Sequence, residues 1–439
     1  MRPTLLFVLI AALLRVEVRA EDAMSFLDNG KIRLGIDLGL GGAVTFLARD
    51  GGENVVNNFD HGRQVQMSFY SGPVPFAAGD KQPAGHWKHL GWNPIQAGDD
   101  FGHGSRVLEH RNDGHSIHVK CVPMQWPLDG VPGDCTFESW LELDGICVKA
   151  RARLNNARRD KTQYPARLQE LPAVYANAPF HRVVSYLGDR PFTGEAISDV
   201  PRPTGNHPWS HWQGTEQWSA LLDDRGFGLG LVTPGRVSFT GGFAGKPGPN
   251  DTHATHTGYI AGQGLEILDH DIVYEYRYEL VLGSLKEIRE RAAMHRPATP
   301  PPPWVFAGDR QGWHFANAED AGWPLKGALD VKLEKDDPQL IGPCTFWRAE
   351  DAPFAIIEAA FHTKQTRGTI FWQRHGRVGP DDSTGFDIAA DGEFHRYSVR
   401  LADAPNYTGG IVRLRFDPVG AGSPGEWVKV RAIRLSRSP

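Results

Sequence analysis

The sequence predicts an all-β protein, with a large antiparallel β-sandwich (a super-sandwich) followed by a smaller β jelly roll. Glycine (50 residues) and proline (32 residues) are abundant among the 439 residues, which indicates short strands joined by many turns. Apolar and polar residues also alternate in several segments, for example at residues 32–38, 148–154, 272–282 and 395–401. A period of two is typical of half-buried antiparallel strands.

A proline-rich segment divides the chain. Ser284 and Glu287 have the spacing of a capping box, which predicts a short helix that runs to His295. Four consecutive prolines follow at residues 300–303, and such a run is a stiff, extended spacer. We therefore expect a super-sandwich domain at residues 21–295, a linker at 296–304 and a jelly-roll domain at 305–439.

The first 20 residues are typical of a signal peptide. Arg2 gives the positive start, residues 5–14 form a short apolar core, and Ala20 ends a small-residue cleavage site. The apolar stretch is too short for a comfortable membrane span, and no second stretch occurs in the sequence. We expect a secreted or periplasmic protein without a membrane span.

Charge and cysteine content argue against several classes of partner. The formal net charge is −5 at pH 7, whereas binding to nucleic acid needs a concentrated basic surface. Cys121, Cys135 and Cys147 precede the linker and Cys344 follows it, which allows at most one disulfide within a domain. Because no C-x-x-C pair occurs, a thiolate zinc site is not expected. The sequence predicts no metal and no cofactor, and it does not indicate an oligomeric state.

Two regions resemble known families. Residues 390–397, 407–411 and 414–418 resemble the galactose-binding-like jelly rolls that accompany many secreted glycan-degrading enzymes. Residues 41–47 and 54–63 resemble, more loosely, the opening strands of the galactose-mutarotase-like super-sandwich. The resemblance implies a carbohydrate-active protein whose partner is a poly- or oligosaccharide, without assigning a specific enzyme family.

Side chains suited to sugars concentrate in the first domain. The segment after Arg63 places Gln64, Gln66, Ser68 and Tyr70 on one strand face, and uncharged amides and hydroxyls match sugar hydroxyls. The 13 tryptophans can stack on sugar rings, although each can equally be a core residue. The predicted substrate-binding residues are Arg63, Gln64, Gln66, Tyr70, Trp92, His103, Tyr175, His211, Trp212 and Trp218.

Four carboxylates are the candidates for catalysis: Asp60, Asp100, Glu170 and Glu216. Asp100 lies in a glycine-rich loop at residues 92–105, which could equally be an Asp-capped turn or a calcium site. Glu170 stands in an apolar segment, where burial would raise its pKa as a general acid requires. Glycoside hydrolysis needs two such groups about 5 to 10 Å apart, but the sequence does not show which two meet.

Three functions fit these residues. A secreted glycoside hydrolase that acts through paired carboxylates on a poly- or oligosaccharide is the leading hypothesis. A polysaccharide lyase on a uronate-containing glycan is an alternative, with Arg63 and Gln66 neutralising the uronate and Tyr70, Tyr175 or His103 as base. A non-catalytic glycan-binding protein is the third.

Overall fold

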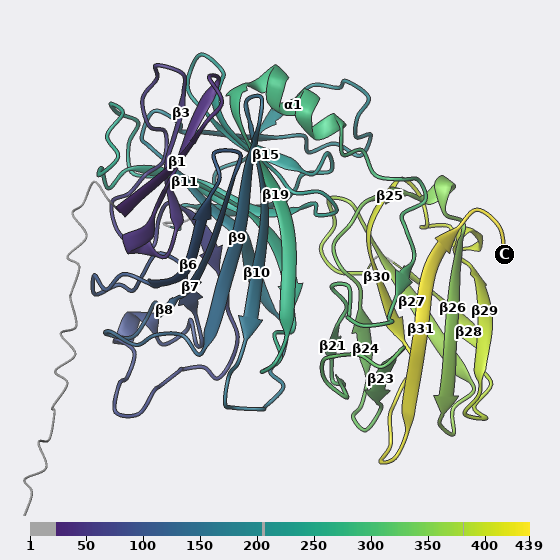
Figure 1. The fold of residues 1–439 in the computed structure, drawn as a ribbon. Coiled ribbons are helices and arrows are strands. Elements are labelled where there is room, and N and C mark those ends of the chain that lie inside the picture. The colour runs from purple at the N-terminus through teal and green to yellow at the C-terminus, as the bar shows by residue number, and fades with distance from the viewer. Residues whose placement is uncertain (1–22, 204–206, 381) are drawn as a thin grey trace, which may run out of the picture.

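The computed structural model describes residues 23–203, 207–380 and 382–439, so the predicted signal peptide at residues 1–20 lies outside the described residues. Antiparallel sheets form two sandwiches, a larger one from the first part of the chain and a smaller one from the last part (Figure 1). The predicted fold class is confirmed. No helix in the described ranges is long and apolar enough to cross a membrane.

The first sheet of the larger sandwich carries most of the polar side chains discussed below. Its strands follow the order β1 (Met24–Asp28), β2 (Ile32–Asp37), β3 (Ala43–Arg49), β4 (Val65–Ser68), β11 (Arg167–Ala176), β18 (Thr257–Glu266), β17 (Ser238–Ala244) and β14 (Trp209–Gln213). The short strands β5 (Pro94–Ile95) and β8 (Met124–Gln125) extend it from β4.

The second sheet covers the inner face of the first. Its strands follow the order β13 (Ser198–Asp199), β12 (Arg182–Ser185), β15 (Trp218–Leu222), β16 (Phe227–Val232), β19 (Val273–Ser284), β10 (Cys147–Asn156), β9 (Cys135–Asp144), β7 (Ser116–Val122) and β6 (Arg106–Asn112). The core between the sheets includes Val65, Met67 and Phe69 of the first sheet and Leu154 and Leu280 of the second.

Helix α1 (Leu285–Ala293) closes one face of the second sheet. The Ser284 side chain accepts a hydrogen bond from the Glu287 backbone, and the Glu287 side chain accepts one from the Ser284 backbone. The predicted capping box is therefore confirmed. Ile288 and Ala292 pack into an apolar cluster with the second sheet, and the helix ends two residues before the predicted His295.

The smaller sandwich also consists of two sheets. One contains β22 (Glu319–Asp320), β23 (Leu329–Lys332), β31 (Trp427–Ser436), β26 (Phe354–His362) and β29 (Phe394–Arg400), with β20 (Trp304–Val305) paired to β31. The other contains β21 (His314–Ala316), β24 (Gln339–Ile341), β30 (Gly410–Asp417), β27 (Arg367–Arg374) and β28 (Asp382–Asp387), with β25 (Trp347–Arg348) paired to β30.

A buried ion pair joins the two sandwiches. Arg310, which follows β20, lies 2.7 Å from Asp269 of the larger sandwich and 2.6 Å from Asp320 of the smaller one. Gln163 donates hydrogen bonds to both carboxylates. All four cysteines lie in the described part of the chain and are free thiols.

Candidate functional site

Three cross-strand rows of side chains occupy the outer face of the first sheet, which points away from the second sheet. Their members follow from the printed strand pairs and the alternation along each strand. The first row is Tyr175, Tyr259, Gly242 and Trp209; the second is Gln66, Ala173, Ala261, Thr240 and His211; the third is Ser68, Glu170, Gln263, Ser238 and Gln213.

A β-bulge in β11 brings Glu170 onto this face. Glu170 pairs with Gln263 and Ala173 pairs with Ala261, so three residues of β11 match two residues of β18. Strict alternation would place Glu170 and Tyr175 on opposite faces of the strand. The extra residue shifts the alternation by one position, so both side chains lie on the same face. A bulge commonly re-aims a side chain next to an active site, and here it aligns Glu170 with the tyrosines.

Glu170 is a half-buried carboxyl among hydroxyl groups. The Tyr259 hydroxyl donates a hydrogen bond to its Oε1 at 2.5 Å, and Ser68 and Tyr70 also interact with it. Burial raises the pKa of Glu170 above its ordinary value, although the hydrogen bonds from Tyr259, Ser68 and Tyr70 oppose that rise. Among the described residues no cation forms an ion pair with Glu170, so the group is poised to hold a proton.

The tyrosines around Glu170 are held in their neutral form. Burial and the nearby Glu170 charge raise the pKa of Tyr70, Tyr175 and Tyr259. The rings of Tyr175 and Tyr259 lie 4.6 Å apart, and Trp209 meets Tyr259 at 4.9 Å. Tyr175 and Trp209 remain half-buried, so the aromatic row offers proton donors and a partly open apolar surface.

A cavity of about 580 Å³ adjoins this row. Gln64 lines the cavity, and its backbone oxygen accepts a hydrogen bond from the Tyr175 backbone. The Asn58 Oδ1 and His61 Nδ1 atoms belong to two other lining residues, and both atoms are buried without a hydrogen-bond partner in the described chain. Buried polar atoms normally have a partner, but neither of these two atoms is exposed, and His61 Nδ1 lies against Gly98, so neither is presented to a ligand in this conformation.

Two predicted carboxylates line the same cavity. Asp60 forms an ion pair with Arg63 at 3.4 Å, and its charge contributes to the raised pKa of Tyr175. Asp100 accepts a hydrogen bond from the Trp87 indole at 2.5 Å. Asp60 and Asp100 therefore share one cavity, whereas Glu170 does not line it and is linked to it through Tyr175, whose raised pKa reflects burial and the charges of both Glu170 and Asp60.

Glu216, the fourth predicted carboxylate, is in a different place. It is 1% exposed and lies 2.7 Å from Arg289 of helix α1. It also accepts hydrogen bonds from the Phe192 backbone and the Trp218 indole. With all its partners supplied by the protein and no solvent access, Glu216 is a structural residue.

Three predicted sugar-binding tryptophans belong to the core, which corrects the prediction. Trp92 and Trp218 are 0% exposed, and Trp212 is 9% exposed and stacks on Phe239. Trp212 alternates with His211, so it points into the sandwich when His211 points outward. The three indoles fill the core of the larger sandwich and present almost no surface to a ligand.

The other predicted binding residues divide into two groups. Tyr70, Tyr175 and His211 belong to the outer face, where His211 is exposed and lies 3.2 Å from Gln263. The buried amides Gln64 and Gln66 bind backbone oxygens of the turn that leads into β4, so both mainly shape that turn.

Arg63 and His103 are both anchored by the protein. Arg63 donates to the Ala254 and Thr255 carbonyls in addition to its pair with Asp60. His103 lies 2.9 Å from Asp99. Asp99 in turn accepts backbone hydrogen bonds from Phe101, His103 and Gly130. In this part of the loop at residues 92–105, the capped-turn interpretation holds.

Sequence reasoning missed Tyr259, Gln263 and Trp209. Tyr259, Ala261 and Gln263 alternate with Ile260 and Gly262 in β18, which is the signal that could have marked an outward polar face. It escaped notice because the strand is buried along nearly its whole length. Near-continuous burial masks alternation in a central strand.

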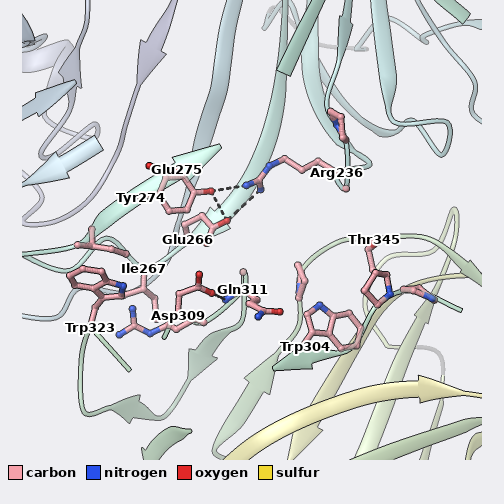
Figure 2. A pocket seen from close by; sticks show the side chains of 18 of the residues that line it. Arg236, Glu266, Ile267, Tyr274, Glu275, Trp304, Asp309, Gln311, Trp323 and Thr345 are labelled. Carbon is pink, nitrogen blue, oxygen red and sulfur yellow. Dashed lines mark hydrogen bonds and ion pairs between the residues drawn. The ribbon is translucent and has the colours of Figure 1, made fainter. Parts of the chain in front are cut away.

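A second cavity, of about 700 Å³, lies between the sandwiches (Figure 2). Arg236 donates to the Tyr274 hydroxyl at 2.8 Å and pairs with Glu266 at 3.4 Å, and Tyr274 donates to Glu266 at 2.8 Å. These groups satisfy one another, and none of the predicted site residues lines this cavity. The outer face of the first sheet is therefore the better candidate site.

No protein-family model matches the sequence, and no curated protein matches it. Among solved structures, a galactose mutarotase-like protein from Lactobacillus casei ATCC 334 aligns at 12% identity and a TM-score of 0.38, over 59% of this chain and 99% of that chain. A galactose mutarotase related enzyme from Lactobacillus acidophilus aligns at 12% identity and 0.34, over 60% and 97%.

The GH36 alpha-galactosidase AgaB from Geobacillus stearothermophilus aligns at 11% identity and a TM-score of 0.35, over 62% of this chain and 41% of that chain. Galactose mutarotase-like proteins are the class that residues 41–47 and 54–63 resemble. Similarity at this level establishes no activity for this chain, so an activity has to be inferred from its own side chains.

Proposed function

We propose that the chain is a secreted glycoside hydrolase that acts on a poly- or oligosaccharide, with Glu170 as the general acid. The observation that carries the proposal is the environment of Glu170: a half-buried carboxyl with a raised pKa, set among the hydroxyl groups of Tyr259, Ser68 and Tyr70, with no cation partner among the described residues. A general acid has to hold its proton near the working pH, and burial favours that form.

Asp60 is the second carboxylate in this proposal. It lies 3.4 Å from Arg63 and lines the cavity, whereas burial favours the protonated form of Glu170. Glycoside hydrolysis needs a second carboxylate as nucleophile or base beside the acid. Tyr175 lies within the electrostatic influence of both carboxylates, which supports a sugar position above this ring.

The surroundings of the site suit a neutral sugar unit at the cleaved bond. Tyr175 and Trp209 present partly open ring surfaces, and the uncharged side chains of Ser68 and Gln263 lie on the same face of the sheet. Stacking and a few convergent polar groups are the usual composition of a ligand site.

Hydrolysis fits these groups better than elimination by a lyase. A lyase base has to take a proton from a sugar carbon, so a tyrosine in that role needs a lowered pKa. The pKa values of Tyr70, Tyr175 and Tyr259 are all raised. His103 is held by Asp99 in its own turn, so neither type of predicted base is well placed.

Digestion of a glycan panel, read by mass spectrometry, tests the proposal. Each product pair is expected to gain one water, without the ultraviolet absorbance of a new C=C bond. On a cleaved glycan, Glu170→Gln is expected to lower kcat by about 10² to 10⁴-fold, because the proton donor is lost. Asp60→Asn is expected to lower kcat by a similar factor.

Glu109→Gln is the matched control, because Glu109 is an exposed carboxylate on β6 of the other sheet. It is expected to retain wild-type activity. Full hydrolysis by Glu170→Gln would contradict the role of Glu170, and unsaturated products would identify a lyase instead. Tight binding of a glycan with no product from any member of the panel would identify a binding protein.

A further inference from the structure

A groove on the smaller sandwich contains two arginines that pair with no carboxylate among the described residues. Its volume is about 360 Å³, and its main lining side chains are Gln339, Phe371, Gln373, Arg377, Arg413 and Arg415. We call it the arginine groove. It lies on the outer face of β24, β30 and β27, because the alternate residues Leu340, Ile370, Leu414 and Phe416 point into the core.

The three arginines differ in their partners. Arg415 pairs with Asp417 at 2.5 Å and with Asp337 at 3.2 Å, and its guanidinium lies 4.6 Å from the Phe371 ring centre. Two carboxylates thus neutralise Arg415. Neither Arg413 nor Arg377 forms an ion pair with a carboxylate in the described residues, so two cations of the groove remain uncompensated.

Arg413 also has a hydrogen-bond donor without a partner among the described residues. Its Nε atom is buried without a hydrogen-bond partner in the described chain, whereas buried donors are normally paired. Its guanidinium interacts with the Cys344 thiol, and burial raises the pKa of that thiol. The thiol therefore stays neutral and leaves the charge of Arg413 uncompensated.

The arginine groove adjoins the outer face of the first sheet. The Gly376 backbone, in the loop that continues to Arg377, donates a hydrogen bond to Gln213 Oε1 at 3.3 Å. Gln213 ends the row that begins with Ser68 and Glu170. Three strand spacings separate Gln213 from Glu170, which is about 14 Å along the sheet, and an oligosaccharide spans such a distance.

We propose that the arginine groove binds a negatively charged group, a carboxylate or a sulfate, on the glycan that this protein recognises. Arg413 and Arg377 supply charge-assisted hydrogen bonds, which are the strongest that such a group makes with a protein. Phe371 supplies an apolar surface for the sugar ring. The proposal concerns binding and does not depend on whether Glu170 catalyses hydrolysis.

Calorimetric titration of the full chain tests the proposal. Three oligosaccharides of equal length serve as probes: an oligogalacturonate, a sulfated galactan fragment and a neutral gluco-oligosaccharide. At least one acidic probe is expected to bind about tenfold or more tightly than the neutral probe, since a hydrogen bond to a charged group contributes that much. Which acidic probe binds distinguishes carboxylate from sulfate. Repeating the titrations with Glu170→Gln as the background separates binding from any cleavage that requires Glu170.

Arg413→Gln and Arg377→Gln are each expected to weaken binding of the acidic probe about tenfold and to leave binding of the neutral probe unchanged. Arg434→Gln is the matched control: Arg434 is an exposed arginine on β31 of the other sheet, and its removal changes the net charge equally. If Arg413→Gln does not fold, Arg377→Gln provides the same test, because the Arg377 side chain is exposed.

Two results would overturn the proposal. One is equal binding of acidic and neutral probes by the parent protein. The other is an equal loss of affinity in Arg434→Gln and Arg377→Gln. That result would show that the net charge of the protein, and not the groove, determines affinity for the acidic probe.

Discussion

Replacement of Arg310 by methionine is expected to destabilise the contact between the sandwiches far more than replacement of any exposed arginine there. The Arg310 Nε and Nη2 atoms bind both oxygens of Asp320 at 2.6 and 2.7 Å, and Nη2 also binds Asp269 at 2.7 Å. The three side chains are 5%, 0% and 5% exposed. Arg310→Met would leave two buried carboxylates without their cation.

The magnitude follows from burial. Loss of one partner from a buried ion pair costs about 3 to 5 kcal/mol, because the remaining charge is uncompensated and desolvated. Gln163 and the Trp323 backbone still donate hydrogen bonds to Asp269, which keeps the expected loss within that range. Arg348→Met is the matched control across the same interface. Its pair with Asp189 is 31% and 48% exposed, so its loss should cost at most about 1 kcal/mol.

Urea denaturation, followed by tryptophan fluorescence and by circular dichroism, measures both variants. Two probes are needed because two sandwiches need not unfold in one step. Arg310→Lys should fall between wild type and Arg310→Met, since lysine restores the charge without the planar fork. Equal losses of unfolding free energy in Arg310→Met and Arg348→Met would refute the reasoning from burial.

Two further predictions concern single side chains. The raised pKa of Glu170 means that the folded state keeps a proton which the unfolded state releases, so wild-type stability falls as pH rises above the unfolded pKa, about 4.3. In Glu170→Gln the side chain at this position does not titrate. The melting temperature of the variant should therefore rise relative to that of wild type as the pH increases from about 4. A difference in melting temperature that does not change with pH would contradict the raised pKa. Tyr407→Phe should lower the free energy of unfolding, measured by chemical denaturation, by about 1 to 3 kcal/mol. The reason is that the buried Tyr407 hydroxyl accepts a hydrogen bond from the Trp347 indole and donates one to the Ala352 carbonyl. Glycan affinity should not change.

Much of the fold follows from local sequence patterns. Val148, Ala150, Ala152 and Leu154 are all at most 6% exposed, as their alternation in residues 148–154 predicts. The capping box at Ser284 depends only on residues three apart, so sequence alone suffices there. Both predictions succeed because a strand face and a helix start are set by near neighbours in the chain.

The candidate site could not be predicted from local sequence patterns in the same way. Tryptophan beside polar residues indicated sugar contact, but Trp92, Trp212 and Trp218 fill the core, because neighbours in sequence do not determine which face a large side chain takes. Glu170 and Tyr175 meet only because a bulge adds one residue to β11. That bulge depends on pairing with β18, a distant strand in the sequence. Pro172 inside the bulge is the one local signal, because proline within a sheet is confined to edges and bulges.

Glu170 differs in its partners from several other buried acids of the chain. Glu216 has Arg289, Asp269 and Asp320 share Arg310, and Asp99 caps a turn through backbone hydrogen bonds. Each of these carboxylates is satisfied by a structural role. Glu426 of the smaller sandwich also has no cation partner among the described residues, but it accepts a hydrogen bond from the Lys364 backbone. Glu170 has hydroxyl partners and no cation among those residues, and its burial lowers stability above about pH 4. The proposed role of Glu170 as general acid accounts for the retention of such a group and for the bulge that turns Glu170 toward Tyr175 and Tyr259.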